Sequence, residues 1–245
     1  MAAEKRVERA VVAVLRALHE HRVAELVVRK RGRLTQLECD RAAPFHGASL
    51  VRVSDLAPEA VVPLLRGRFG RPYRFVPECP STQRLLGVDD IEGTVVATDH
   101  QTEGRGRLGR TWEDAPTRSL LFSLLLQPPV PMALWPELSL VAGRSVAQAL
   151  RDIGVDASLR HPNDVVVEGR KVVGVLPEAS PGRVVLGVGV NVNQTAAELP
   201  GETAKPPTSV RLELGREVER APLLALVLAE LENGYAAWCT AHARS

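Results

Sequence analysis

The residues with the clearest capacity for chemistry lie in the stretch 104–112. It runs Gly-Arg-Gly-Arg-Leu-Gly-Arg-Thr-Trp, so three glycines and three arginines interleave within nine positions. Glycine lets a backbone approach a ligand closely, and the planar guanidinium of arginine matches a phosphate or a carboxylate. We interpret the stretch as a loop that binds an anion and becomes ordered when the anion draws the arginines inward. A solvated basic hairpin is the alternative, because short Gly/Arg runs also occur in nucleic-acid tails.

The next informative stretch is residues 170–176, whose second residue is a lysine. Strand alternation places Lys171 on the same face as Val173 and Val175. A lysine on a buried face is costly to desolvate unless an anion meets it, so we predict that Lys171 is functional. The alternative is a lysine at a strand end whose ammonium reaches solvent.

The strand expected at residues 184–191 has one face almost without side chains. A period of two places Gly187, Gly189 and Asn191 on that face and apolar residues on the other. A ligand or another backbone can approach such a face closely. The Asn191 amide could then bind a base or a phosphate. A helix packed tightly against the glycines is the alternative.

The elements that must position these residues predict an α+β fold. Period-two and continuous apolar runs predict strands at 73–76, 94–98, 119–126, 157–160, 165–167, 170–176 and 184–191. Helical periodicity predicts a main core helix over 137–154, with Gly154 as its stop, and a final apolar helix over 222–242. Pro177 is expected to interrupt the strand that carries Lys171.

The first 70 residues predict a small α+β module of its own. A helix is expected over 6–21, and strands at 25–28 and 34–37 flank a basic turn, so a hairpin is expected there. Asp55 is expected to cap a helix with Pro58 in its first turn, although Pro63 disfavours its continuation. The Gly-, Arg- and Pro-rich run 67–72 predicts the boundary, which divides the chain into 1–70 and 71–245.

The basic hairpin could belong to a DNA-binding winged helix. Such a domain needs two or three helices with an apolar recognition-helix pattern, and only one helix is expected before the hairpin. We therefore favour a solvated hairpin on an accessory module, with no DNA partner.

Composition limits the class of protein and its surroundings. The chain has 245 residues, 45% of them hydrophobic, and a net charge of +2, which is too small for general nucleic-acid binding but suits an anionic small molecule and an acidic protein partner. Three distant cysteines argue for a reducing compartment and against a disulfide scaffold or a metal site. No apolar run approaches the roughly 20 residues that span a membrane, and the N-terminus lacks a signal-peptide profile, so a cytoplasmic protein is expected.

Five motifs in one order resemble the catalytic domain of the biotin protein ligases, over residues 75–242. The family patterns are S-T-N, G-R-G-R-x-G-R-x-W, K-W-P-N-D, R-K-x-x-G-I-L-x-E and G-x-G-I-N. The matching residues are Ser81-Thr82-Gln83, the loop 104–112, Arg160-His161-Pro162-Asn163-Asp164, the stretch 170–178 and the stretch 187–191. Several motifs in the family's order make the resemblance far more specific than any one of them.

The resemblance implies a fold and an activity. The fold would be a mixed β-sheet flanked by helices, as in the class II synthetase-like catalytic domain of the biotin/lipoate protein ligases. The activity would be an ATP-dependent biotin protein ligase, in which the biotin carboxylate attacks the α-phosphate of Mg-ATP to give biotinyl-5′-AMP and pyrophosphate. A lysine of a biotin carboxyl carrier protein would then accept biotin and release AMP. The implied cofactors are ATP and Mg²⁺, no membrane partner is expected, and a homodimer is left open.

The resemblance also implies the site residues, with no metal bound by protein ligands alone. The catalytic residues would be Lys171, Arg105 and Arg107. The biotin contacts would be Ser81, Thr82, Gln101, Arg105, Gly106, Arg107, Lys171 and Gly174. The nucleotide contacts would be Arg107, Arg110, Trp112, Asn163, Asp164, Lys171, Gly187, Gly189 and Asn191.

Other interpretations of several of these residues stay open. Ser81 or Thr82 could cap a helix, Trp112 could be a core residue, and Asn163 with Asp164 could form a turn. His100 has no matching role in the family, and we interpret it as a satisfied histidine.

The sequence departs from the family pattern in three places. Arg160 and His161 replace lysine and tryptophan, which is expected to change the wall and the charge near the adenylate. Pro177 precedes Glu178, and Ser245 ends the sequence without the SH3-like domain that follows in most members. We expect these differences to affect ATP affinity and carrier docking, and the N-terminal module is a candidate substitute. A catalytically degenerate biotin-binding or biotin-sensing homologue is the alternative function, whereas lipoate ligases and octanoyl transferases lack the loop 104–112.

Overall fold

The chain divides into two compact units, Met1–Val51 and Arg52–Ser245. The structure, a computed structural model, describes residues 26–30, 33–37, 54–201 and 205–243. In the first unit β1 (Leu26–Lys30) and β2 (Arg33–Leu37) pair antiparallel, which confirms the predicted hairpin. The helix expected over 6–21 lies outside the described residues, as does any helix that a winged helix would need.

The larger unit is built on one seven-stranded sheet with the order β3-β4-β5-β9-β8-β7-β6. Only β3 and β4 are parallel, and the other neighbours pair antiparallel, so the predicted mixed sheet is confirmed. The strands are β3 (Tyr73–Cys79), β4 (Val95–Gln101), β5 (Ser119–Leu126), β6 (Ser158–Arg160), β7 (Asp164–Val167), β8 (Arg170–Ser180) and β9 (Arg183–Asn191).

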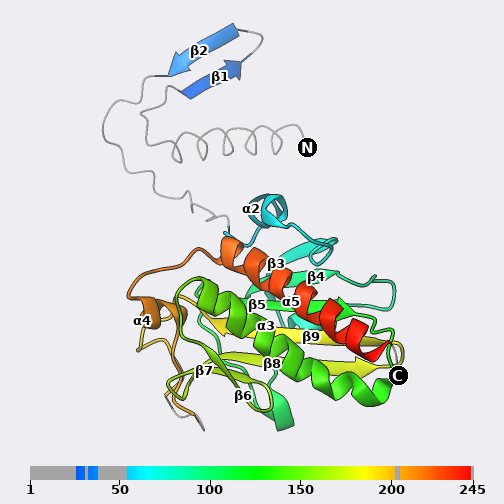
Figure 1. Cartoon of the computed structure of the whole chain (residues 1–245). Coiled ribbons are helices and arrows are strands. Elements are labelled where there is room, and N and C mark those ends of the chain that lie inside the picture. Colours follow the sequence, from blue (N-terminus) through cyan, green and yellow to red (C-terminus); the bar gives the residue numbers. More distant parts are fainter. Residues whose placement is uncertain (1–25, 31–32, 38–53, 202–204, 244–245) are drawn as a thin grey trace. The chain divides into compact units, whose positions relative to one another are not determined.

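Two long helices, α3 (Leu138–Asp152) and α5 (Arg220–His242), pack together on one face of the sheet (Figure 1). Their apolar residues form one core with alternate residues of the strands, such as Leu186, Val188 and Val190 of β9. Both predicted helices are confirmed, and Gly154 follows the first with a φ of +96°. The opposite face of the sheet is left for the short helices η2 (Thr82–Leu85) and η3 (Arg107–Gly109) and for the loops. Two further short helices are η4 (Met132–Glu137) and α4 (Val210–Leu214).

Residues 54–70 belong to the larger unit, whereas the sequence had suggested a boundary at residue 70. The helix expected there is short, because α2 (Pro58–Val61) tightens into η1 (Val62–Leu64) at Pro63, which has no N–H to donate. Four large apolar residues of the segment 54–70 are buried in the core of the larger unit: Leu56, Val61, Leu65 and Phe69. The Gly-, Arg- and Pro-rich run that follows is a turn inside this unit, with Gly70 at a φ of +87°.

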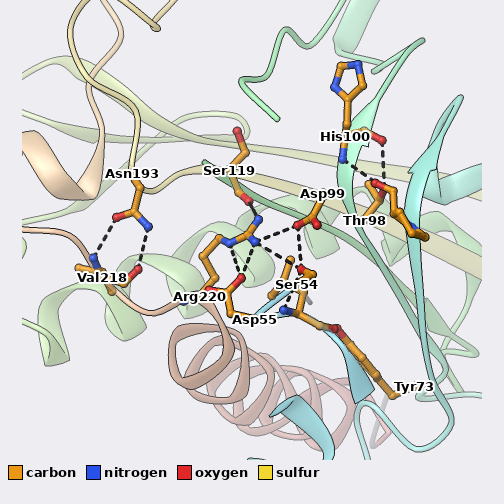
Figure 2. Close-up of polar contacts among 12 residues, drawn as sticks. Ser54, Asp55, Tyr73, Thr98, Asp99, His100, Ser119, Asn193, Val218 and Arg220 are labelled. Carbon is orange, nitrogen blue, oxygen red and sulfur yellow. Dashed lines mark hydrogen bonds and ion pairs between the residues drawn. The ribbon is translucent and has the colours of Figure 1, made fainter. Parts of the chain in front are cut away.

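The expectation that Asp55 caps this helix is wrong. Ala57 is the N-cap of α2 and offers no side chain to it, while the Asp55 carboxylate accepts hydrogen bonds from the backbone N–H and the Nε of Arg220, at 3.1 and 2.9 Å. Figure 2 shows the Arg220 guanidinium between Asp55 and Asp99, with Nη1 donating to the Ser119 carbonyl at 2.9 Å. Asp55 therefore stabilises the start of α5, and Arg220 ties that start to β4 and β5.

Pro177 does not interrupt β8, contrary to expectation. The strand continues to Ser180, and Pro177 pairs with Leu186 of β9. On its other side β7 pairs only with Arg170 to Gly174 of β8. Pro177 thus lies on a stretch with a single neighbouring strand, where the missing N–H is tolerated.

Candidate active site

A bulge in β8 decides which way Lys171 faces. Val165 pairs with Val173 and Val166 with Lys171, so β8 has one more residue than β7 at this point. Val172 takes up the extra position and is buried together with Val173. Lys171 therefore shares a face with Gly174, whose Cβ, if present, would lie 3.5 Å from the lysine Nζ. The predicted alternation of Lys171 with Val173 and Val175 is wrong for this reason.

Glycines leave the centre of this sheet face bare, as predicted for β9. A Cβ on Gly189 would come within 2.6 Å of the Trp112 indole, and so would one on Gly174. A Cβ on Gly187 would lie 2.8 Å from the Gln83 side chain. Trp112 covers Gly174 and Gly189, and Gln83 of the short helix η2 covers Gly187, while the two long helices pack on the opposite face of the sheet. The alternative of a helix packed against the glycines therefore holds at Gly187, whereas the hairpin residue Trp112 covers the other two.

The arginine-rich loop forms a small hairpin. The Gly106 N–H donates to the Arg110 carbonyl at 2.7 Å, and the Trp112 N–H donates to the Gly104 carbonyl at 2.9 Å. A Cβ on Gly104 would lie 2.3 Å from the Trp112 carbonyl oxygen, so glycine is required there. The hairpin joins the end of β4 to β5 across the glycine face.

Two of the loop arginines are held from outside the loop. Arg105 Nη2 donates to Glu178 Oε2 at 2.8 Å, and Arg107 Nη1 donates to Asn163 Oδ1 at 3.1 Å. Arg105 Nε and Trp112 Nε1 are buried donors without a hydrogen-bond partner in the part of the chain that the structure describes. Because buried donors are costly to leave unpaired, these two point to an acceptor on a ligand.

Two cavities meet at Trp112 and Lys171. The smaller, about 50 Å³, is lined mostly by neutral groups, including Thr82, Gln83, Gln101, Gly174, Gly187 and Gly189, and also by the cationic side chains of Arg105, Arg107 and Lys171. The larger, about 570 Å³, is lined by charged and amide side chains, including Arg107, Arg110, Asp164, Lys171, Asn191 and Lys205. The residues that line both are Gly106, Arg107, Trp112, Asn163 and Lys171. Trp112 is thus a shared wall of the two cavities.

Hydroxyl and amide groups form the neutral end. Gln101 Oε1 accepts from the Thr82 backbone N–H at 2.9 Å and from its hydroxyl at 3.2 Å, and that hydroxyl also lies 2.7 Å from Ser123 Oγ. Ser81 is buried beside them and does not line either of these two cavities. It stands at the N-cap of η2 without a side-chain bond, so the capping interpretation is wrong for Ser81.

One carboxylate stands among the cations of the charged end. Asp164 Oδ1 lies 2.9 Å from Lys171 Nζ, and Asp164 Oδ2 accepts a hydrogen bond from Lys205. Burial alone would raise the pKa of Asp164, but the hydrogen bonds from the two lysines outweigh it and lower that pKa. Asp164 therefore stays ionised at neutral pH.

The motif around Asn163 is both a turn and a cavity wall. His161 to Asn163 connect β6 to β7, and Asn163 Nδ2 donates to the Val175 carbonyl at 2.8 Å. Asn163 and Asp164 still line the larger cavity. Arg160 and His161 line neither of these two cavities, although His161 lines a neighbouring cavity together with Arg107.

The Asn191 amide also has partners within the protein. Its Nδ2 donates to the Thr208 carbonyl at 3.0 Å, and its Oδ1 accepts from Gln194 Nε2 at 3.2 Å. Asn191 lines the larger cavity, whereas Gly187 and Gly189 of the same strand line the smaller one. The glycine face thus serves a different cavity from Asn191.

His100 makes an internal contact, as interpreted. Its Nδ1 lies 3.0 Å from Asp114 Oδ2, and Asp114 Oδ1 accepts from the Gln101 backbone N–H at 3.4 Å. Burial raises the pKa of Asp114, and the hydrogen bond from His100 opposes that rise. The pair fastens the end of the loop to the backbone beside Gln101.

Sequence reasoning missed three residues of the site. Gln83 lines the smaller cavity and donates to the Leu176 carbonyl at 3.1 Å, and Glu178 binds Arg105. Lys205 binds Asp164 across 41 positions of sequence. Gln83 and Glu178 stand inside motifs already quoted, and Lys205 is one of only four lysines in the chain. Membership of a motif could have identified Gln83 and Glu178 as site residues, and the rarity of lysine could have identified Lys205.

The described part of the chain contains no group of three His, Cys, Asp or Glu side chains arranged to hold a metal ion. None of its helices is long and apolar enough to cross a bilayer.

Comparison with known proteins identifies the family. The profile of the biotin/lipoate A/B protein ligase family matches residues 80–194. The structure of the Aquifex aeolicus biotin protein ligase in complex with biotin and ATP is similar, with 37% sequence identity and a TM-score of 0.61 over 67% of this chain and 70% of that one.

Two sequence relatives agree. The bifunctional ligase/repressor BirA of Bacillus subtilis is 35% identical over 61% of this chain, and the biotin–[acetyl-CoA-carboxylase] ligase of Mycobacterium tuberculosis is 35% identical over 62%. The match spans 48% of the Bacillus protein and 58% of the mycobacterial one. The five motifs, the sheet and these comparisons agree, and the chain belongs to the biotin/lipoate A/B protein ligase family.

Proposed function

We propose that this protein is an ATP-dependent biotin protein ligase. It would convert biotin and ATP to biotinyl-5′-AMP and pyrophosphate, and then transfer biotin to a lysine of a biotin carboxyl carrier protein. The observation that carries the proposal is the pair of unlike cavities, one lined mostly by neutral groups and one mostly by charged and amide groups, that share Arg107 and Lys171. Such a site suits a carboxylic acid whose remaining part is uncharged and whose carboxylate must meet a nucleotide phosphate.

The neutral cavity suits biotin. Hydroxyl and amide groups such as Thr82 and Gln101 can donate to and accept from a ureido group. Gly187 and Gly189 line this cavity beneath Gln83 and Trp112, and a side chain on either glycine would displace these two residues. We therefore move the two glycines from the proposed nucleotide contacts to the biotin contacts. The carboxylate of the ligand would then point to Lys171 at the junction.

The charged cavity suits the nucleotide. In the first step a biotin carboxylate oxygen forms a bond to the α-phosphorus, and the bond to pyrophosphate breaks. Lys171 and Arg107, which line both cavities, would stabilise the negative charge of the carboxylate and the α-phosphate. Arg110, which lines only the larger of the two cavities, would contact the phosphates. Each charge-assisted hydrogen bond contributes about 1.5–3 kcal/mol, so losing one costs roughly ten- to a hundredfold in rate.

Mg²⁺ would enter with ATP. It favours one or two carboxylates plus phosphate oxygens and water, and Asp164 and Glu113 are the carboxylates of this cavity. Glu113 would hold a phosphate-bound Mg²⁺, and Asp164 would join it once a lysine turns from its carboxylate to the phosphates; the ion would neutralise phosphate charge.

The second step needs a protected intermediate. A carrier lysine amine attacks the acyl carbon of the mixed anhydride, and AMP leaves with the bonding electrons. Water would destroy the same anhydride. The hairpin 104–112 lies over both cavities, and we assign it the role of excluding water.

Pyrophosphate release in the presence of biotin and ATP tests the first step. The wild type should release pyrophosphate only when biotin is present, and Lys171→Ala should abolish the release. Arg66→Ala, at an exposed position outside both cavities, is the matched control and should behave as wild type. A wild type that binds biotin by calorimetry but releases no pyrophosphate would overturn the proposal and identify a biotin-binding homologue.

A further inference from the structure

Two lysines converge on one carboxylate at the charged cavity. The chain has only four lysines among its 31 basic residues, and two of them, Lys171 and Lys205, pair with Asp164. The side chains of both lysines are largely buried, with 29% and 28% of their surface exposed. Asp164 itself is buried in β7.

The backbone around Lys205 is fastened to Lys171. The Lys171 N–H donates to the Pro206 carbonyl at 2.7 Å, and the Thr208 N–H donates to the Lys171 carbonyl at 2.8 Å. Pro207 thereby forms a parallel bridge with Lys171, and Asn191 Nδ2 holds the Thr208 carbonyl. The segment that follows Lys205 is therefore in register with the strand that carries Lys171, which places both ammonium groups beside the same cavity.

The two lysines differ in which cavity they line. Lys171 lines both cavities, whereas Lys205 lines the larger one and not the smaller. Four cationic side chains, those of Arg107, Arg110, Lys171 and Lys205, face two carboxylates in the larger cavity. This excess of positive charge suits a ligand with several negative charges, and Lys205 belongs to the part that does not touch the neutral cavity.

We propose that Lys205 binds the polyphosphate of the nucleotide and the pyrophosphate that leaves, and that Asp164 positions its ammonium group. This inference rests on the proposed function and adds a residue to it. An ammonium group on a long flexible stem can turn from the carboxylate to a phosphate oxygen while staying charged. Lys171 then stabilises the carboxylate and the α-phosphate between which the new bond forms, and Lys205 binds the pyrophosphate that leaves.

The test compares Lys205→Met, Lys205→Arg and the control Arg66→Met in the full chain. Pyrophosphate alone is the first probe, and calorimetry should show an affinity about tenfold weaker in Lys205→Met than in the wild type. Lys205→Arg keeps the charge and should stay within about threefold, and Arg66→Met should be unchanged. In biotin-dependent pyrophosphate release, Lys205→Met should raise KM for ATP about tenfold and leave the Kd for biotin unchanged.

The outcomes separate this inference from the proposed function. Weaker pyrophosphate binding in Lys205→Met supports the inference even if the wild type shows no biotin-dependent release, in which case only the ligase proposal fails. Unchanged pyrophosphate affinity in Lys205→Met would overturn it, as would a wild type that binds no pyrophosphate. An equal loss of biotin and pyrophosphate affinity, also seen in Lys205→Arg, would mean a general packing role and would overturn it too.

Discussion

Under the proposed function, Arg107 is the loop residue that covers the intermediate, because it lines both cavities and donates to Asn163 from the hairpin. Arg105 Nη2 binds Glu178 on β8, which fastens the loop, while the buried Arg105 Nε faces no acceptor in the described part of the chain and suits one on the ligand. Of the two cavities, Arg105 lines only the smaller one.

Removing the Arg107 side chain should let the intermediate escape. We expect Arg107→Gly to shorten the lifetime of bound biotinyl-5′-AMP about ten- to a hundredfold, because a charge-assisted contact is lost and water gains access. The measurement is the half-life of the bound adenylate after rapid removal of free ligand. Arg216→Gly, at an exposed position, is the control, and an unchanged half-life in Arg107→Gly would contradict the assignment.

Gly189 should be intolerant of a side chain for a reason that involves Trp112. A Cβ there would lie 2.6 Å from the indole, so Gly189→Ala should push Trp112 into the smaller cavity. We expect the Kd for biotin, measured by calorimetry, to rise at least tenfold. Gly87→Ala, whose Cβ would have its nearest neighbour at 3.9 Å, should bind biotin as the wild type does. Equal affinities in the two variants would disprove the role of the bare surface.

At the scale of the element, the start of α5 depends on a buried cation. The side chain of Arg220 is 4% exposed and binds Asp55, Asp99 and the Ser119 carbonyl, which joins a helix, two strands and the segment before α2 (Figure 2). Removal of one partner from such a group leaves uncompensated buried charge, which costs more than the pairing itself contributes.

Arg220→Met should therefore destabilise the larger unit strongly. We expect the free energy of unfolding in urea to fall by about 3–5 kcal/mol, because Asp99 keeps its charge in a buried place. Arg68→Met is the matched control, since Arg68 pairs with Glu232 but is 74% exposed, and it should cost less than about 1 kcal/mol. Similar losses in the two variants would show that Arg220 contributes no more than a surface pair.

At the scale of the whole molecule, the division at Val51 and Arg52 determines which truncations can fold. Deleting residues 1–51 leaves the core of the larger unit complete, so that variant should keep a cooperative thermal transition. Deleting residues 1–70 removes four large buried apolar side chains, those of Leu56, Val61, Leu65 and Phe69. Each contributes about 1.5–3 kcal/mol, so their sum approaches the total stability of about 5–15 kcal/mol.

We therefore expect the 1–70 deletion not to fold, as judged by circular dichroism and calorimetry. A folded, cooperative 71–245 fragment would contradict this. The 1–51 deletion also tests the hypothesis that the N-terminal module helps hold ATP. On that hypothesis its KM for ATP should rise, and an unchanged KM would refute it.

Local pattern was enough to determine much of this protein. The apolar run of β5, the bare face of β9, the helix before Gly154 and the loop of glycines and arginines each depend on neighbours a few positions away. Because side chains alternate in a strand and repeat every 3.6 residues in a helix, such features are visible in the chain itself. The order of five motifs then identified the family before any coordinate was known.

Other features depended on contacts between distant segments. A bulge in the pairing of β8 with β7 decides on which face of the sheet the Lys171 side chain lies, and the alternation of residues within β8 alone does not reveal this. Lys205 meets Asp164 across 41 positions, and residues 54–70 join the larger unit by burying side chains against elements far along the chain. Register and long-range burial are properties of two segments at once, and this is why only the tertiary structure decided them.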